Sequence, residues 1–220
     1  MSNSPRFRLL AEPLDDACTW RGRWETRKGG TTFGVVREAS VLQCGLGRFP
    51  LAPGMYFSVP ASFSLEGGSG FCVRVPGFEG FFQVGGPIEA KGRLRYINGC
   101  TDSLLIPPVI CGDPCLNFLH LPAHSAQAMH THPSVRIGVV MSGEGRCVTM
   151  DSEHTLRPGM GFIIEAGLPH AFRPGAEPLR VVAFHPDSDV GPKHDDHPMI
   201  NRTLVEGISA RHQRELHTER

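Results

Sequence analysis

The sequence predicts an all-β fold, and three observations support this class. Its 220 residues include 26 glycines and 19 prolines, which require many turns between short elements. From Trp20 onward, short runs rich in β-branched and aromatic residues alternate with Gly and Pro turns. Two similar segments in the two halves of the chain also indicate an internal repeat. A chain of this length can form one large or two small domains, each with a buried core.

Composition and charge exclude several classes of function. The 22 basic residues balance the 22 acidic residues and form no basic stripe, so we expect no nucleic-acid partner. No apolar run approaches the length of a membrane span, and residues 1–16 lack the apolar core of a signal peptide. Seven scattered cysteines without a second close pair favour reduced, mostly buried thiols. We therefore expect a cytoplasmic protein with no membrane partner.

The elements can be justified in order along the chain. Residues 1–16 form a polar leader that we expect to pack as an arm on another strand or subunit. Alternating or β-rich runs predict strands at Phe33–Val36, Val41–Cys44, Met55–Val59, Phe71–Val75, Arg93–Ile97, Leu116–Leu121 and Leu179–Phe184. The His- and Asp-rich residues 185–198 are interpreted as a solvated loop rather than a second metal site. Residues 203–217 have a helix-forming composition and predict a short helix in the tail.

The repeat rests on two pairs of segments. Leu51–Phe57 (LAPGMYF) can be laid over Leu156–Phe162 (LRPGMGF), and Phe33–Val36 (FGVV) over Ile137–Val140 (IGVV). The interpretation is that the chain holds two related β-barrel halves. The alternative is a coincidental similarity around a smaller N-terminal β-extension.

Three histidines form the candidate metal site. His130 and His132 lie one residue apart, and on an extended strand their side chains would point to the same face. His170, from a neighbouring strand, would complete three nitrogens around one point, with positions left open for substrate or dioxygen. When the two halves are aligned, these three positions fall on Thr26, Lys28 and Leu65. We therefore expect no metal ligands in the N-terminal half.

At these residues the chain resembles the cupin superfamily. The first cupin motif is matched by His130–His132, Arg136, Ile137–Met141 and Gly143–Gly145. The second motif is matched by Pro158–Met160, Phe162–Ile164, Glu165–Gly167 and His170. Both motifs occur in order over roughly residues 115–186. The chain departs from the pattern in three places: Arg136 replaces the usual Glu ligand, Met160 replaces an Asp, and Glu165 replaces a Pro.

The resemblance implies a double-stranded β-helix, also called a jelly-roll barrel, and with the repeat it implies a bicupin. Residues 1–100 would be a degenerate, structural half that covers sheet edges of the second half or shapes the mouth of its pocket. Residues 101–190 would be the metal-binding cupin domain, followed by a tail at residues 191–220. Cupins often form dimers, so a homodimer is expected from the resemblance.

The ligand set limits the choice of metal. Three neutral imidazoles without a carboxylate suit Fe(II), Zn, Ni, Mn or Cu. The resemblance extends to three-histidine iron dioxygenases that act on thiols or β-dicarbonyl compounds, and it favours Fe(II) with dioxygen. The leading expectation is therefore a non-heme iron dioxygenase for a small anionic or chelating substrate. The alternatives are a redox-silent metal-dependent isomerase, lyase or hydrolase, and a non-catalytic ligand-binding or sensor module.

Two charged residues are candidates for catalytic roles. An inward Arg136 would match a carboxylate or phosphate in bidentate geometry and would anchor an anionic substrate. The alternatives are an outward Arg136 or an ion pair with Glu165. Glu165 is a candidate for an acceptor that orients a ligand histidine, for a general base, or for the partner of Arg136. The remaining expected lining of the substrate pocket is Gln127, Phe162, Ile164 and Phe172.

Overall fold

The computed structural model describes residues 4–26, 29–110, 112–187, 204–205 and 208–209, without the side chains of residues 98, 204–205 and 208–209. The regular secondary structure of these residues is β-strand, and the single helix among them is a 3-10 turn, η1 (Ile97–Gly99). All strand pairs are antiparallel. The described part of the chain contains no helix that is long and apolar enough to cross a membrane.

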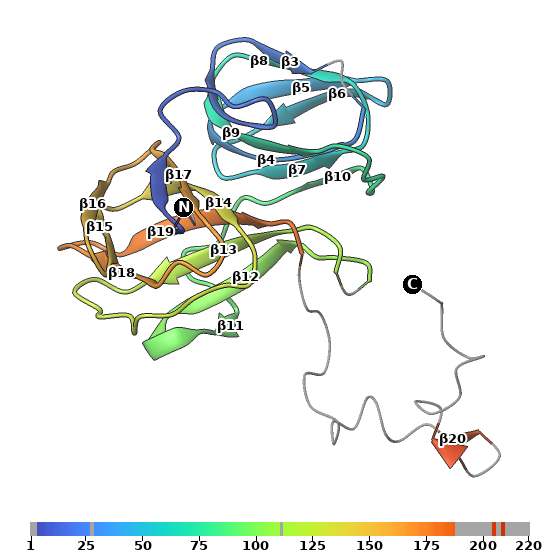
Figure 1. The fold of residues 1–220 in the computed structure, drawn as a ribbon. Helices are drawn as coiled ribbons and strands as arrows, with labels where there is room; N and C mark the ends of the chain where they lie inside the picture. The colour runs from blue at the N-terminus through green and yellow to red at the C-terminus, as the bar shows by residue number, and fades with distance from the viewer. Residues whose placement is uncertain (1–3, 27–28, 111, 188–203, 206–207, 210–220) are drawn as a thin grey trace.

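The N-terminal half contributes two sheets, drawn in blue to cyan at the top of Figure 1. The five-stranded sheet has the order β10-β7-β4-β9-β2, and the four-stranded sheet has the order β3-β8-β5-β6. Their bounds are β2 (Ala17–Arg21), β3 (Trp24–Thr26), β4 (Thr31–Glu38), β5 (Ser40–Cys44), β6 (Gly47–Leu51), β7 (Tyr56–Val59), β8 (Phe63–Glu66), β9 (Ser69–Val75) and β10 (Gln83–Gly85).

The C-terminal half contributes a seven-stranded sheet of order β1-β17-β14-β19-β13-β12-β11 and a three-stranded sheet of order β16-β15-β18. Their bounds are β1 (Phe7–Leu9), β11 (Leu94–Arg95), β12 (Thr101–Ile106), β13 (Cys115–Leu121), β14 (Arg136–Ser142), β15 (Gly145–Thr149), β16 (Glu153–Leu156), β17 (Gly161–Ile164), β18 (His170–Pro174) and β19 (Leu179–His185). A small separate pair consists of β20 (Leu204–Val205) and β21 (Ile208–Ser209).

The two halves share one pairing scheme, which supports the predicted repeat. β4 lies between β7 and β9, as β14 lies between β17 and β19. Gly34 faces Phe57 across the first pair, and Gly138 faces Phe162 across the second. A Cβ at Gly34 or Gly138 would lie 2.3 or 2.5 Å from the facing phenyl ring, so both positions require glycine. That the N-terminal half is a second cupin barrel stays an interpretation.

The pairing corrects one position of the sequence alignment. His130 and His170 form a backbone bridge, and the matching pair in the first half is Thr26 and Phe63. The counterpart of His170 is therefore Phe63 and not Leu65. The reason is loop length, because the connection from β17 to β18 is longer than the connection from β7 to β8.

The halves pack face to face through an apolar layer. One face of β4 and β9 supplies Phe33, Val35 and Val73, and these residues belong to the same buried cluster as Val182 and Phe184 of the C-terminal half. The rings of Phe33 and Phe184 lie 5.4 Å apart, tilted at 51°. The N-terminal half thus covers a sheet face, whereas we expected it to cover sheet edges or to shape the pocket mouth.

The edge of the C-terminal sheet is covered by the N-terminal arm. β1, which belongs to the N-terminal arm, pairs with β17 of the second half (Figure 1). Residues 1–16 were predicted to pack on another strand or subunit, and the partner is this strand. Phe7 is 7% exposed and stacks on His154 at 4.4 Å. This added strand removes an open edge that would otherwise expose unpaired backbone groups.

Two predicted elements differ from the structure. The strand predicted at Arg93–Ile97 is limited to β11, because the chain turns into η1 at Ile97. The described parts of the predicted helix at 203–217 are the strands β20 and β21, whose pairing overrides the helical propensity. The rest of that segment, and residues 188–198 of the predicted solvated loop, lie outside the described residues.

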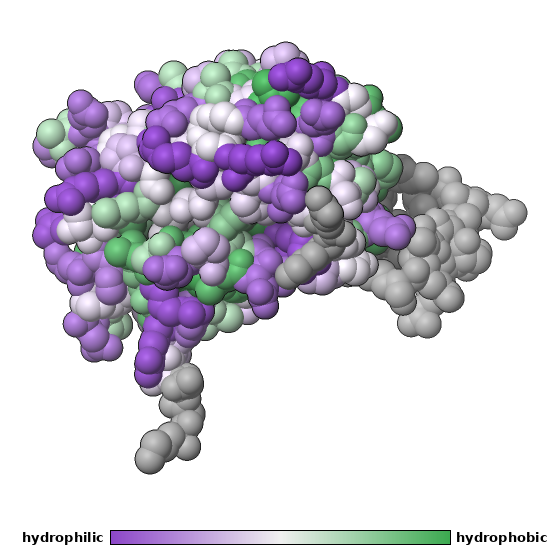
Figure 2. Space-filling model, turned by 90° about the horizontal axis from the view of Figure 1, so that it is seen from above, coloured by the Kyte–Doolittle hydropathy of each residue, from purple (hydrophilic) through white to green (hydrophobic). Residues whose placement is uncertain are grey.

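The cysteines are free and mostly buried, as the sequence predicts, and the surface is of mixed hydropathy. Six cysteines in the described residues are free, and all but Cys44 are buried. Burial raises the pKa of the Cys147 thiol to about 12, as expected for a cysteine that packs in the core. On the face shown in Figure 2, hydrophobic residues are interspersed among hydrophilic ones.

Candidate metal centre and pocket

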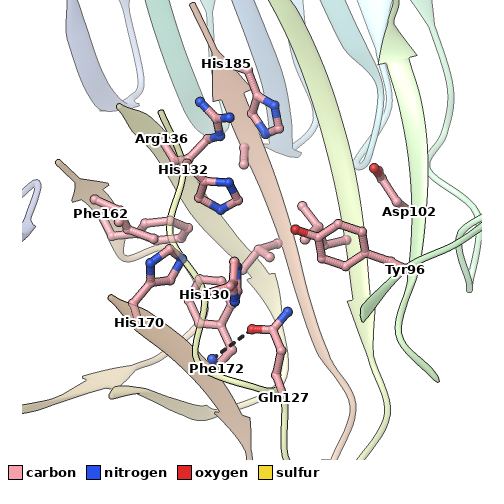
Figure 3. Close-up of a pocket in the computed structure, with 14 residues that line it drawn as sticks. Tyr96, Asp102, Gln127, His130, His132, Arg136, Phe162, His170, Phe172 and His185 are labelled. Carbon is pink, nitrogen blue, oxygen red and sulfur yellow. Dashed lines mark hydrogen bonds between the residues drawn. The ribbon is translucent and has the colours of Figure 1, made fainter. Parts of the chain in front are cut away.

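The three predicted histidines come together at one point. One ligand nitrogen from each of His130, His132 and His170 can be chosen so that all lie within 4.8 Å of one another. The ring centroids are 4.5 to 5.2 Å apart. Figure 3 shows the three rings on one side of the pocket. Three imidazole nitrogens at this spacing can share one metal ion.

The backbone around the histidines differs from the predicted extended strand. Only His130 makes strand-like contacts: its N–H donates to the His170 carbonyl at 3.0 Å, and the His170 N–H donates back at 2.9 Å. His132 lies beyond this bridge, where its carbonyl accepts the N–H of Gly167 at 2.8 Å. The HxH segment is therefore held by isolated contacts, one with the first residue of β18 and one with the loop before it, rather than by a regular ladder.

Backbone carbonyls orient two of the rings. Nδ1 of His130 lies 3.0 Å from the Ala128 carbonyl, and Nδ1 of His170 lies 2.9 Å from the Leu168 carbonyl. Because a carbonyl only accepts, each Nδ1 carries the proton, and Nε2 is the nitrogen left for a metal. The acceptor that orients a ligand histidine is thus a carbonyl two residues upstream, and not Glu165.

Burial keeps the His132 and His170 imidazoles neutral at neutral pH. It lowers the pKa of His132 to about 3, with further lowering by Arg136, His170 and His130. Burial also lowers the pKa of His170 to about 4, although the contact with the Leu168 carbonyl opposes this shift. Neutral imidazole is the form that binds metal, so no proton has to be removed at neutral pH. The donor set therefore fits a divalent metal such as Fe(II), Zn, Ni, Mn or Cu.

The pocket beside the histidines has mostly apolar walls. Phe162 and Ile164 of β17 and Phe172 of β18 line it, as does Gln127. The rings of Phe162 and Phe172 meet edge to face, with centroids 5.8 Å apart. The structure thus places all four expected lining residues along one cavity. The period-two alternation of β17 explains why Phe162 and Ile164 face inward together.

Arg136 also lines this pocket, and only 8% of it is exposed. Its Nη1 donates to the hydroxyl of Ser134 at 2.5 Å and lies 3.8 Å from Asp187 Oδ1. Burial lowers the pKa of the guanidinium, and the Asp187 carboxylate opposes that shift. Arg136 is therefore neither turned outward nor paired with Glu165, the two alternatives to an inward position.

Glu165 lies away from the pocket. It is absent from the residues that line the cavity, and its Oε1 lies 3.3 Å from Nε of Arg8. Its Oε2 accepts the backbone N–H of Arg6 at 2.9 Å. β17 ends at Ile164, so Glu165 leaves the sheet and holds the N-terminal arm. Glu165 therefore does not line the cavity in which its catalytic role was predicted.

One family model matches the region that holds the three histidines. Residues 117–185 match the family model described as "Cupin domain". These residues form a cupin domain. No curated protein sequence matches the chain.

Solved structures with the same fold are distant in sequence. Salicylate 1,2-dioxygenase from Pseudaminobacter salicylatoxidans superimposes with a TM-score of 0.60 at 12% identity, covering 83% of this chain and 76% of that one. A putative glyoxylate-induced protein from Pseudomonas aeruginosa gives 0.58 at 12% identity, covering 89% and 84%. Protein Ylba from E. coli gives 0.56 at 16% identity, covering 84% of each chain. These similarities show a cupin fold.

Three polar residues of the cupin pocket were not predicted from the sequence: Tyr96, Asp102 and His185. His185 could have been found, because it continues the alternation of Val181 and Ala183 along β19, and all three line the cavity. Tyr96 and Asp102 come from the segment that joins the halves, where no motif marks them. Burial raises the pKa of both residues, with Asn117 opposing the shift of Asp102.

The buried imidazoles of the cupin domain predict a pH dependence of stability without metal. Burial first, and Arg136 second, lower the pKa of His185 from 6.5 to about 3. Between these values the unfolded chain binds a proton that the folded chain does not, so stability falls as pH falls. In EDTA, urea unfolding at pH 7, 6 and 5 should show a decreasing free energy of unfolding. A His185→Gln variant should decrease less steeply, and an equal slope would contradict the assignment.

Proposed function

We propose that the cupin domain is a metal-dependent oxygenase that acts on a small anionic substrate. The observation that supports this most directly is a three-histidine donor set that opens on the same cavity as a buried arginine. A divalent metal and a buried guanidinium in one cavity repel each other, and the half-exposed Asp187 carboxylate at 3.8 Å offsets only part of this repulsion, so an anion between them would be favourable. A carboxylate substrate is such an anion.

His130 and His170 hold the metal through Nε2, because Nδ1 of each ring carries the proton. His132 holds it through one of its two ring nitrogens. When bound, Fe(II) would supply the one-electron chemistry that allows dioxygen to react with an organic substrate. Arg136 binds and neutralises the substrate carboxylate through a charged hydrogen bond. The walls formed by Phe162, Ile164 and Phe172 exclude water and leave an apolar space for the carbon skeleton.

The fold neighbours support the choice of an oxygenase over other metal enzymes. They include salicylate 1,2-dioxygenase, one variant of which is a complex with gentisate. The redox-silent alternative relied on Glu165 as a base, and this residue points away from the cavity toward Arg8. The homodimer and the cytoplasmic location stay predictions.

The test is oxygen uptake by protein loaded anaerobically with Fe(II). With aromatic carboxylates, β-diketones and thiols as candidate substrates, we expect consumption of dioxygen with one of the carboxylates. The same protein loaded with Zn(II) serves as the control and should consume none. If no substrate is consumed with either metal, the pocket is a ligand-binding module. Turnover of a substrate by the zinc form would instead indicate redox-silent chemistry.

A further inference from the structure

Three buried side-chain atoms that lack a protein hydrogen-bond partner belong to residues that line the metal pocket. They are Oδ1 of Asp102, Nε2 of Gln127 and Nε of Arg136. A buried polar atom without a partner costs about 1–3 kcal/mol, so such atoms rarely gather in one place without a purpose. In a cavity, they can be satisfied by a ligand or by water that the ligand displaces.

Gln127 is held rigidly and is only 1% exposed. Its Oε1 accepts the backbone N–H of Phe172 at 3.0 Å, and its own carbonyl accepts Nη1 of Arg173 at 2.5 Å. Because Oε1 must receive the N–H, the two ends of the amide cannot exchange. Nε2 is therefore the end that remains a donor, and the Gln127 amide is drawn at the pocket edge in Figure 3.

Asp102 is fixed by a chain of hydrogen bonds behind it. The Cys115 thiol donates to Oδ1 of Asn117 at 2.9 Å, and Nδ2 of Asn117 donates to Oδ2 of Asp102 at 3.0 Å. Asn117 is 6% exposed, so water does not compete for these contacts. No ion pair of Asp102 occurs among the described residues. Its Oδ1 therefore remains an acceptor for a group in the pocket.

Asp102 and Gln127 lie in different parts of the pocket from Arg136. In Figure 3, Asp102 and Tyr96 stand across the cavity from His132 and His170, and Gln127 lies at the end opposite Arg136. A ligand that touches Arg136 can therefore extend past the histidines toward a second polar region.

We infer that Asp102 and Gln127 form a specificity subsite for a carboxylate substrate that has a hydrogen-bond-donating group remote from its carboxylate. Asp102 Oδ1 accepts a hydrogen bond from that hydroxyl or ammonium group, and Gln127 Nε2 donates to an oxygen of the same molecule. The inference rests on the proposed function for the position of the carboxylate at Arg136. A site built to bind a hydroxyl or amine rejects the analogue that lacks it, because its own polar atoms then stay unpaired.

The test compares matched ligands by calorimetry on the Zn(II)-loaded protein, so that binding is measured without turnover. The probes are benzoate, its 3- and 4-hydroxy derivatives, and 4-(aminomethyl)benzoate. We expect at least one donor-bearing probe to bind about tenfold or more tightly than benzoate. Tighter binding of the ammonium probe would identify an amine as the donor, and tighter binding of a hydroxybenzoate would identify a hydroxyl.

Two isosteric variants test the assigned atoms. Asp102→Asn leaves a single side-chain acceptor, which the Asn117 amide takes, so the preference for the donor-bearing probe should fall about tenfold. Gln127→Glu retains the acceptor for the Phe172 N–H but replaces the donor, so the hydroxybenzoates should bind more weakly. Glu153→Gln on the exposed surface is the control and should change neither value.

The outcomes separate the inference from the proposed function. Equal affinity of the wild-type protein for benzoate and every donor-bearing probe would overturn the inference, as would an unchanged preference in Asp102→Asn. If benzoate and all derivatives fail to bind, the anion site at Arg136 is wrong and the inference falls with it. If the preference is present but no dioxygen is consumed, the oxygenase proposal alone fails.

Discussion

Replacing His132 by alanine is expected to abolish stoichiometric metal binding. One of three nitrogens within 4.8 Å of one another is then lost, and two imidazoles remain. Four-ligand zinc sites bind with about 10–16 kcal/mol, so one ligand accounts for about 3 kcal/mol and its loss lowers affinity about 100-fold or more. Elemental analysis of protein purified without chelators should give one metal per chain for the wild type and a trace for the variant.

The matched control is His124→Asn, which replaces an exposed histidine outside the pocket. Its backbone φ of 57° lies in the left-handed region, which asparagine tolerates. This variant should retain the full metal content. Equal metal in His132→Ala and wild type, with both folded by circular dichroism, would show that the three histidines do not form the site.

Replacing Arg136 by methionine should lower the affinity for carboxylates about 10- to 100-fold. The guanidinium is buried beside the pocket and has an unpartnered Nε, so a carboxylate there would gain a charged hydrogen bond. Such bonds contribute about 1.5–3 kcal/mol when water is excluded. Benzoate titration into the Zn(II)-loaded variant and wild type measures the difference.

Stability provides a second readout for the same variant. Methionine fills the volume without a buried charge, so the free energy of unfolding should stay equal or increase. Loss of binding with retained stability therefore separates anion recognition from a structural defect. Arg146→Met, which removes an exposed ion pair with Glu153, should bind benzoate like the wild type. An unchanged affinity in Arg136→Met would remove the anion site.

Much of the fold followed from local sequence patterns. The strands predicted at Phe33–Val36, Val41–Cys44, Leu116–Leu121 and Leu179–Phe184 lie inside β4, β5, β13 and β19. In each case β-branched and aromatic residues, bounded by turn residues, fit a pleated and buried surface. The histidines of the candidate site were also found from the sequence, because His130 and His132 are one residue apart and His170 lies at the position that the second cupin motif gives to a ligand.

Other features depended on contacts between distant segments. Glu165 is five residues from His170, yet its carboxylate is captured by Arg6 and Arg8 of the N-terminal arm. Asp102 lines the pocket because β12 pairs with β13, and Tyr96 lines it from the turn between β11 and β12. No local periodicity in the sequence encodes these contacts between distant residues, because they depend on which strand edges are free to pair.

The sequence by itself determined the all-β class, the cupin motifs over roughly residues 115–186 and the three histidines. These features arise from short-range patterns of turns, alternation and ligand type, which act within a few residues. Only the tertiary structure decided that Arg136 faces the cavity, that Glu165 does not, and that Asp102 completes its polar lining. The reason is physical: a side chain's role is set by the partners that burial leaves within its reach, and those partners come from other strands.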